Sequence, residues 1–131
     1  MNTKLDKILA EISAGELFDK ITILEIKKEK ISNKEKLIDI NKELSSLNET
    51  VKKFIPDQSS ISKHINDLKD INLKLWDIEE NKRRAEKEKK FDETFIQLSR
   101  DVYKSNDERA KIKLKINEIL GSNIKEVKSH Y

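Results

Sequence analysis

The sequence has no cysteine, one proline and two glycines, and aromatic residues make up 5% of its 131 positions. The lack of cysteine excludes disulfides, cysteine-ligated zinc, iron–sulfur clusters and thiol catalysis. The two glycines form no Walker loop, no Rossmann pattern and no nucleophile elbow. No window approaches the roughly 20 apolar residues of a membrane span, and the start Met-Asn-Thr-Lys lacks the apolar segment of a secretory signal. We therefore expect a cytoplasmic protein that needs no cofactor and does not associate with membranes.

Charged residues and residues with high helix propensity dominate the composition. Charged residues make up 40% of the chain and hydrophobic residues 35%, and the net charge of +3 comes from 28 basic and 25 acidic residues that are interleaved along most of the chain. This composition favours long helices over sheets, and the strong periodicity of the apolar residues argues against disorder. A chain of this size with so few apolar residues has a thin core, so we expect self-association.

Local signals divide the chain into four predicted helices. Ser13 and Glu16 have the spacing of a capping box, and Asp92 is a candidate N-cap for the last helix. Pro56 ends the second helix, and Gly121 is placed to terminate the last helix in a left-handed conformation. The predicted helices span residues 14–31, 34–54, 60–89 and 92–120.

The simplest architecture is all-α: an antiparallel helical bundle built from two long helical hairpins, which we expect to form a dimer. One helical domain would span residues 1–131, with a hairpin at 14–55, a loop at 56–60, a hairpin at 61–120 and a short tail at 121–131. The segment 1–12 is either one short amphipathic turn or an extended lead-in.

The last helix carries a heptad stripe of the kind that faces other helices. Ser105 and Arg109 are the polar members of this stripe, so a polar function could lie inside the assembly. Its apolar members recur at alternating spacings of four and three, and they are Phe91, Phe95, Leu98, Val102, Ile112, Ile116 and Ile119.

Three strings appear together in this chain: GELFDKITILEIK at 15–27, LWDIE at 75–79, and the pattern FD..FI...R.VY..ND.RA..K..IN at 91–117. With them the chain resembles, over nearly its whole length, an uncharacterised family of small all-helical bacterial proteins, a domain of unknown function. The resemblance implies an all-helical bacterial protein and carries no known activity with it.

The first helix carries several charged side chains. Glu16 and Lys20 form an i,i+4 pair in the favourable order, which is an ordinary surface feature. The alternative is that Asp19, Lys20 and Thr22 are partly buried, because this helix has apolar residues on several faces, and that they need partners from another helix.

The last helix holds the densest polar group. Arg109 lies on the apolar stripe and cannot be buried without a partner. One interpretation is a structural ion pair, and the candidate carboxylates for ion-pair or acid–base roles are Glu16, Asp19, Glu25 and Glu79. The other interpretation is an anion pocket, in which Arg100 or Arg109 grips a carboxylate or phosphate in bidentate fashion. Its candidate ligand residues are Lys20, Arg100, Asn106, Arg109 and Lys113.

The third helix adds two features with ordinary interpretations. Trp76 beside the apolar face is typical of core or dimer-interface packing. The basic run at 82–90 is typical of a solvated helix end, and nucleic-acid binding would need exposed aromatics or a recognised module besides. Paired Glu-x-x-His motifs are absent, since neither His64 nor His130 falls in that pattern, so we expect no metal site.

These features leave two functional hypotheses. The first is a non-enzymatic scaffold or adaptor that acts through protein–protein contacts. The second is a small all-helical enzyme or ligand-binding protein with an Arg/Lys anion pocket between the first and last long helices, of the general kind found in chorismate mutase. Whether the protein is an enzyme stays open at this point.

Overall fold

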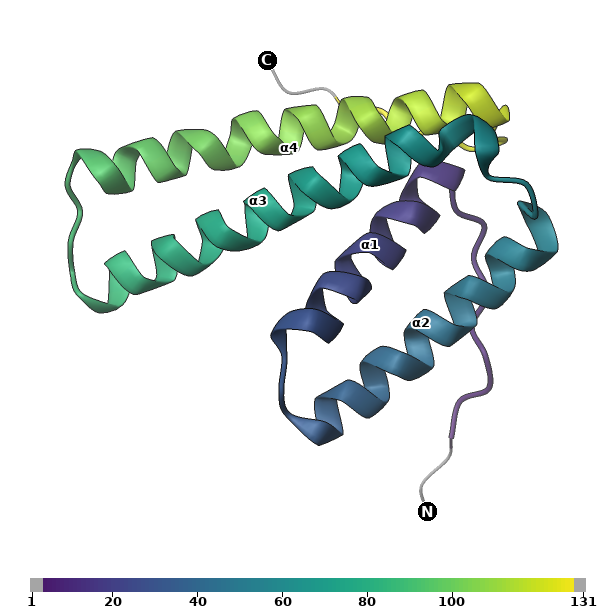
Figure 1. Ribbon diagram of the computed structural model, residues 1–131, viewed down its shortest axis with the longest axis horizontal. Coiled ribbons are helices and arrows are strands. Elements are labelled where there is room, and N and C mark those ends of the chain that lie inside the picture. Colours follow the sequence, from purple (N-terminus) through teal and green to yellow (C-terminus); the bar gives the residue numbers. More distant parts are fainter. Residues whose placement is uncertain (1–3, 129–131) are drawn as a thin grey trace.

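The computed structural model describes residues 4–128, and all of its regular structure is helical. The ends of the predicted domain at residues 1 and 131 lie outside the described residues. Four α-helices and one 3₁₀ turn follow each other along the chain (Figure 1): α1 (Ala14–Lys30), α2 (Lys34–Phe54), η1 (Ser59–Ile61), α3 (Ser62–Lys87) and α4 (Glu93–Leu120). The predicted all-α class is confirmed.

The predicted helix ends are formed by the expected residues. The Ser13 Oγ accepts from the amide of Glu16 at 3.1 Å and so caps α1. The carboxylate of Asp92 accepts from two amides in the first turn of α4 at 3.1 and 3.3 Å. Gly121 follows α4 at φ 62° and ψ 46°, a left-handed conformation that other residues adopt only at a cost. Pro56 lies two residues beyond the end of α2.

The helix α1 is the centre of the arrangement, because it contacts α2, α3 and α4. The helices α3 and α4 lie side by side and run in opposite directions (Figure 1). The helix α1 covers the half of this pair that contains the start of α3 and the end of α4, and α2 packs against α1. The other half extends beyond them. We refer to this extension, residues 79–102, as the distal end.

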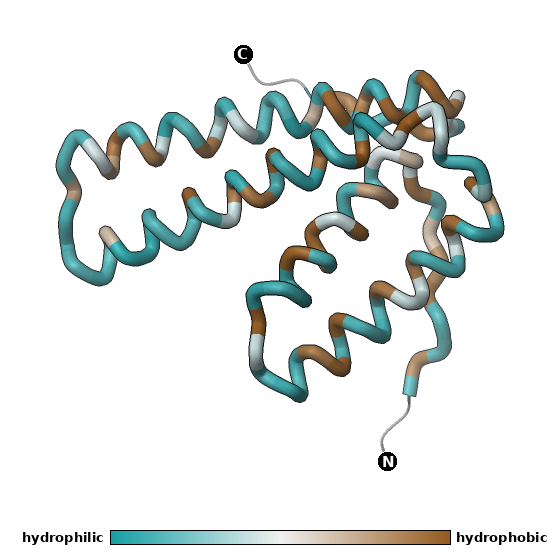
Figure 2. Tube along the Cα trace, viewed as in Figure 1, coloured by the Kyte–Doolittle hydropathy of each residue, from teal (hydrophilic) through white to brown (hydrophobic). Residues whose placement is uncertain are grey.

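The core lies where α1, the end of α2, η1 and the covered halves of α3 and α4 meet. Its buried cluster consists of Leu17, Phe18, Ile21, Val51, Ile61, Leu68, Ile71 and Ile116. All of these residues lie outside the distal end. Brown apolar segments in Figure 2 face one another at the covered half, whereas the distal end is mostly teal. Burial of apolar surface therefore stabilises the covered half in particular.

Some of the predicted apolar faces are not buried. Phe91 and Ile119, at the two ends of the α4 stripe, are exposed to 55% and 38%, and Ile116 is the only one of its apolar members that is fully buried. Phe54 is also exposed, and the neighbouring Ile55 packs on the core instead. The segment 4–12 is extended and its apolar side chains are exposed. Such a short segment does not sustain a helix without packing.

Within residues 4–128, none of the helices combines the length and the apolar character that a membrane crossing requires.

Candidate functional site

The most buried charge in the described chain belongs to Asp19 on α1, which is 1% exposed. The guanidinium of Arg109 on α4 grips this carboxylate in bidentate fashion: Nε donates to Oδ1 at 2.9 Å, and Nη2 donates to Oδ2. Asn72 on α3 donates its side-chain amide to Asp19 Oδ1 and to Thr22 Oγ1, at 3.0 Å each. Asp19 therefore ties together three helices.

A second cation lies next to this pair. Lys113, one helical turn after Arg109 on α4, donates its Nζ to Glu16 Oε2 at 2.7 Å and lies 3.7 Å from Asp19 Oδ2. The same Nζ reaches Glu126 Oε2 at 3.2 Å, in the segment that follows α4. We refer to Glu16, Asp19, Arg109, Lys113 and Glu126 as the charged cluster. It holds three carboxylates and two cations.

The N-terminus of α1 lies beside the charged cluster, and this protein fills it with its own acceptors. The amide of Ala14 donates to Ser122 Oγ at 3.2 Å, and the amide of Gly15 donates to Asn117 Oδ1 at 2.6 Å. The next amide donates to the N-cap described above. Helix N-termini often bind anions through free amides, but here those amides already have partners.

The pKa values of the cluster move in the direction that keeps it charged. Burial alone would raise the pKa of Asp19, but the bonds from Arg109 and Asn72 outweigh it and lower that pKa below its ordinary value. The bond to Asp19 raises the pKa of Arg109. The pKa of Lys113 is raised as well, because its carboxylate partners outweigh the effect of burial. Similarly, the bonds from Lys113 lower the pKa of Glu126 against the effect of its partial burial.

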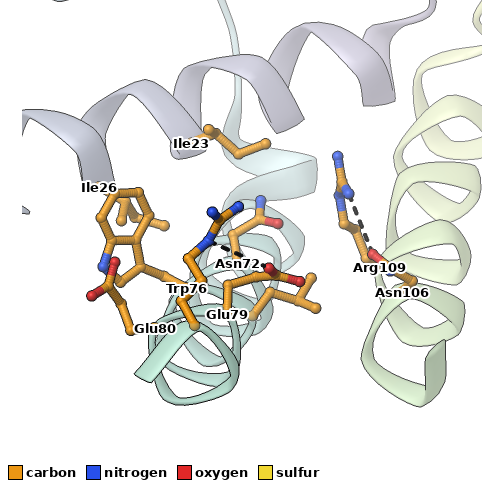
Figure 3. Close-up of a pocket in the computed structure, with 10 residues that line it drawn as sticks. Ile23, Ile26, Asn72, Trp76, Glu79, Glu80, Asn106 and Arg109 are labelled. Carbon is orange, nitrogen blue, oxygen red and sulfur yellow. Dashed lines mark hydrogen bonds and ion pairs between the residues drawn. The ribbon is translucent and has the colours of Figure 1, made fainter. Parts of the chain in front are cut away.

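A cleft of about 450 Å³ opens between α1, α3 and α4 next to this cluster (Figure 3). Arg109 and Asn106 form the wall on α4, where Arg109 Nη1 donates to Asn106 Oδ1 at 3.4 Å. The α1 wall is apolar, and the α3 wall combines an indole with charged side chains. The lining residues are Ile23, Ile26, Asn72, Leu75, Trp76, Glu79, Glu80, Arg83, Asn106 and Arg109.

The structure brings together five of the residues that the sequence singled out: Glu16, Asp19, Asn106, Arg109 and Lys113. It places Arg100 elsewhere, exposed to solvent. Arg100 precedes Arg109 by nine residues, about two and a half helical turns, so the two side chains leave α4 on opposite sides. The structure therefore does not place the two arginines side by side.

Three other predicted residues lie at the margin of the charged cluster or of the cleft. Lys20 is exposed and forms the expected pair with Glu16, at 3.7 Å. Glu25 is half-buried on α1, in the electrostatic range of Lys69. Glu79 lines the cleft and lies 3.9 Å from Arg83 on its own helix.

Sequence reasoning missed three participants. Asn72 follows Ile71 directly within an apolar stretch of α3, and a polar residue in such a position was an available signal. Asn117 follows Ile116 in the same way on α4. Glu126 lies in a segment without periodicity, so the sequence carried no signal for it.

The described geometry defines an all-helical protein with a buried, internally paired charged cluster beside an open cleft. Its sequence belongs to DUF6165, a family of unknown function, which matches residues 8–131. No curated protein and no solved structure matches the chain. Within residues 4–128 no group of three metal-ligating side chains could hold a metal ion, and His130 lies outside that range.

Proposed function

We propose that the protein is a non-enzymatic scaffold or adaptor that acts through protein–protein contacts. The observation that carries this proposal is the internal pairing of the charged cluster. Two nitrogens of the Arg109 guanidinium, Nε and Nη2, donate to Asp19, and Lys113 faces three carboxylates. An anion would have to compete with carboxylates that are already in place, so the cluster is better suited to fixing the positions of α1, α3 and α4.

The exposed apolar residues support contacts with other proteins. The strongest case is the extended segment before α1, in which Leu5, Ile8 and Leu9 are each at least 80% exposed. These residues have the i, i+3, i+4 spacing of an amphipathic helix although the segment is extended. A partner that offered an apolar groove would allow this segment to fold on binding.

We further propose the architecture in which this function operates. The contacts of α1 with α2 and of α3 with α4 support two helical hairpins, at 14–55 and 61–120, within one domain. A homodimer with coiled-coil contacts would cover part of the exposed α4 stripe. A cytoplasmic location in a bacterium remains a prediction from the sequence.

In-cell cross-linking with the full chain tests this proposal. We expect cross-links to a protein other than the chain itself, and we expect the double variant Leu5→Glu, Leu9→Glu to lose them. The matched control Lys4→Glu, Lys7→Glu changes two charges in the same segment and leaves the apolar residues intact. Loss in both variants, or in neither, would contradict a docking role for the apolar residues. The absence of any such cross-link would contradict the scaffold proposal itself.

One observation favours the alternative, a small all-helical enzyme or ligand-binding protein with an anion pocket between α1 and α4. Arg109 and Asn106 line the 450 Å³ cleft, so the outer edge of the guanidinium faces open space. A thermal-shift panel of phosphates, nucleotides and dicarboxylates tests this alternative. A shift by one of these ligands that Asn106→Ala abolishes would support the pocket, and no shift across the panel would support the scaffold.

A further inference from the structure

Four side chains form a stripe along one face of the last part of α3. Trp76, Glu80, Arg83 and Lys87 are spaced by four, three and four residues, so they lie in a row along the helix. We refer to these four residues as the α3 stripe. Along the helix the stripe contains an aromatic residue, an acidic residue and then two basic residues. Its first half therefore differs from its second half in charge.

The α3 stripe continues a face that is covered earlier in the same helix. Asn72, one turn before Trp76, bonds to Asp19 on α1, and Lys69, one further turn back, forms a salt bridge with Glu29 of α1 at 3.1 Å. Trp76 still lies beside the end of α1, since it lines one cleft with Ile26 and another with Lys30. Beyond Trp76 the two helices diverge (Figure 1), and α3 continues beside α4. The same face of one helix is therefore buried by α1 at first and then left open.

The open part has little internal pairing. Glu80 and Lys87 have no ion-pair partner within residues 4–128. Arg83 has one, Glu79 in the preceding turn, and the Arg83 Nε and Glu79 Oε2 atoms lie 3.9 Å apart. Trp76 and Glu80 each line two clefts, one on either side of the stripe. Figure 3 shows Trp76, Glu79 and Glu80 together on α3 at the edge of the cleft that Asn106 and Arg109 also line. The α3 stripe therefore lies between two clefts, and its charged side chains could pair with charges on another molecule.

The order of these residues is self-complementary when two copies of the helix run in opposite directions. In an antiparallel pair of α3 helices, Glu80 of one copy lies opposite Arg83 of the other, and Trp76 lies opposite Lys87. Two-fold symmetry repeats each contact, which gives two ion pairs and two contacts between an ammonium group and an indole face. We propose that two copies of this chain associate through the α3 stripe in this antiparallel register.

The proposed register fixes where the two copies would meet. The symmetry axis would pass between Glu80 and Arg83, at the distal end, and the covered halves of the two copies would point in opposite directions (Figure 1). The basic run at 82–90 is interrupted by Glu86 and Glu88, which favours a mixed-charge partner over a nucleic acid. The inference rests on the self-association that belongs to the proposed function, and it specifies the face and the register.

Sedimentation equilibrium with single charge reversals tests this register. Wild type should dimerise, and more weakly at high salt, because the contacts are exposed. Glu80→Arg and Arg83→Glu should each weaken the dimer roughly tenfold or more, since each variant places like charges opposite each other twice. An equimolar mixture of the two variants should associate about as well as wild type, because the reversed charges then complement each other across the heterodimer.

The matched control is Asp70→Arg, which makes the same charge change on α3 at an exposed position off the stripe. It should dimerise like wild type, and circular dichroism should show the same helix content for all variants. A monomeric wild type, unaffected single variants, or a mixture that stays monomeric would each overturn the proposal. So would a gel shift with a nucleic acid that Arg83→Glu abolishes, because it would assign the stripe to that ligand.

This result is separable from the test of the proposed function. If the charge-reversal pattern fails while cross-links to another protein persist, the antiparallel register is wrong and the scaffold proposal stands. If the pattern holds while no other protein is cross-linked, the dimer stands and the scaffold proposal falls.

Discussion

The two halves of the α3–α4 pair differ in composition and in surroundings. The distal end is richer in charged residues and poorer in apolar residues than the covered half. In the covered half, α1 lies against both helices, Leu68 and Ile116 are completely buried, and Asp19 and Arg109 pair in the interior. In the distal end the same two helices have only each other among the described elements, and Phe91 is 55% exposed. A third helix and a more apolar sequence therefore together decide which side chains of this pair become core.

Ion pairs show the same contrast. The carboxylate of Asp19 is buried and receives bonds from two other helices, α3 and α4, so its partners fix a unique position. Glu88 and Lys90 at the distal end lie 3.3 Å apart, but both side chains are about half exposed or more. Pairs of the first kind are costly to break, whereas pairs of the second kind contribute little. The following variants test this difference.

The largest effect should come from Asp19→Ala. This change leaves the guanidinium of Arg109 and the amide of Asn72 without their acceptor in a buried site, so we expect the free energy of unfolding to fall by about 4 kcal/mol. Urea denaturation followed by circular dichroism measures it. Glu88→Ala is the control from the distal end, with an expected change within about 0.5 kcal/mol. Similar losses in both variants would remove the distinction between the two halves.

A double variant sharpens this result. Replacing both partners, as in Asp19→Leu with Arg109→Met, removes the unpaired charge together with the pair. We expect the double variant to be more stable than Asp19→Ala. A loss equal to the sum of two independent single losses would show that the two residues do not act as a pair.

The next largest effect should come from Gly15→Ala. A Cβ built on Gly15 would lie 2.4 Å from the backbone oxygen of Lys113, so α1 and α4 would have to separate at the charged cluster. We expect a loss of about 3 kcal/mol, measured by thermal or urea denaturation. Gly121→Ala is the matched control, because a Cβ at Gly121 would meet no neighbouring atom and the backbone there is left-handed. We expect it to lower the free energy of unfolding by about 1 kcal/mol. A larger loss at Gly121 would mean that the close approach of α1 and α4 matters little.

The fold could be predicted from the sequence to the extent that its signals are local. Ser13, Pro56, Asp92 and Gly121 each act within one turn of the backbone, and the helix ends that they predicted are the observed ones. The exposure of Phe91 could not be predicted in this way. Its position in the stripe is as regular as that of Ile116, and only the end of α1 determines which of the two is covered.

The candidate site was predictable in part for a similar reason. A guanidinium on an apolar stripe requires a buried acceptor, so the sequence indicated that Arg109 needs a carboxylate. The choice among the candidate carboxylates depends on how α1 is placed against α4, across 90 residues of chain. The separation of Arg100 from Arg109 was also available from the sequence, because the helical repeat alone places the two residues on opposite sides of α4.

The pH dependence of stability should originate in the covered half. The folded-state pKa of Asp19 is lowered, so its contribution to stability is present above the ordinary carboxyl pKa of about 4 and is lost as the pH falls through the lower folded value. Glu126 changes in the same direction. We expect urea midpoints to fall on acidification below about pH 4. Asp19→Asn should be less stable at neutral pH and should show a shallower decline. An unchanged decline would place the acid sensitivity elsewhere.

The smallest effect should come from Phe91→Ala at the tip of the distal end. The Phe91 ring packs edge-on against Phe95 with centroids 5.3 Å apart, but it is more than half exposed, so we expect a loss of about 1 kcal/mol or less. Amide hydrogen exchange should accelerate in residues 85–98 and stay unchanged around Asp19 and Ile116, because the core cluster and the charged cluster do not depend on this ring. Accelerated exchange in both halves would show that the distal end and the covered half unfold as one cooperative unit. The difference in burial would then have no counterpart in local stability.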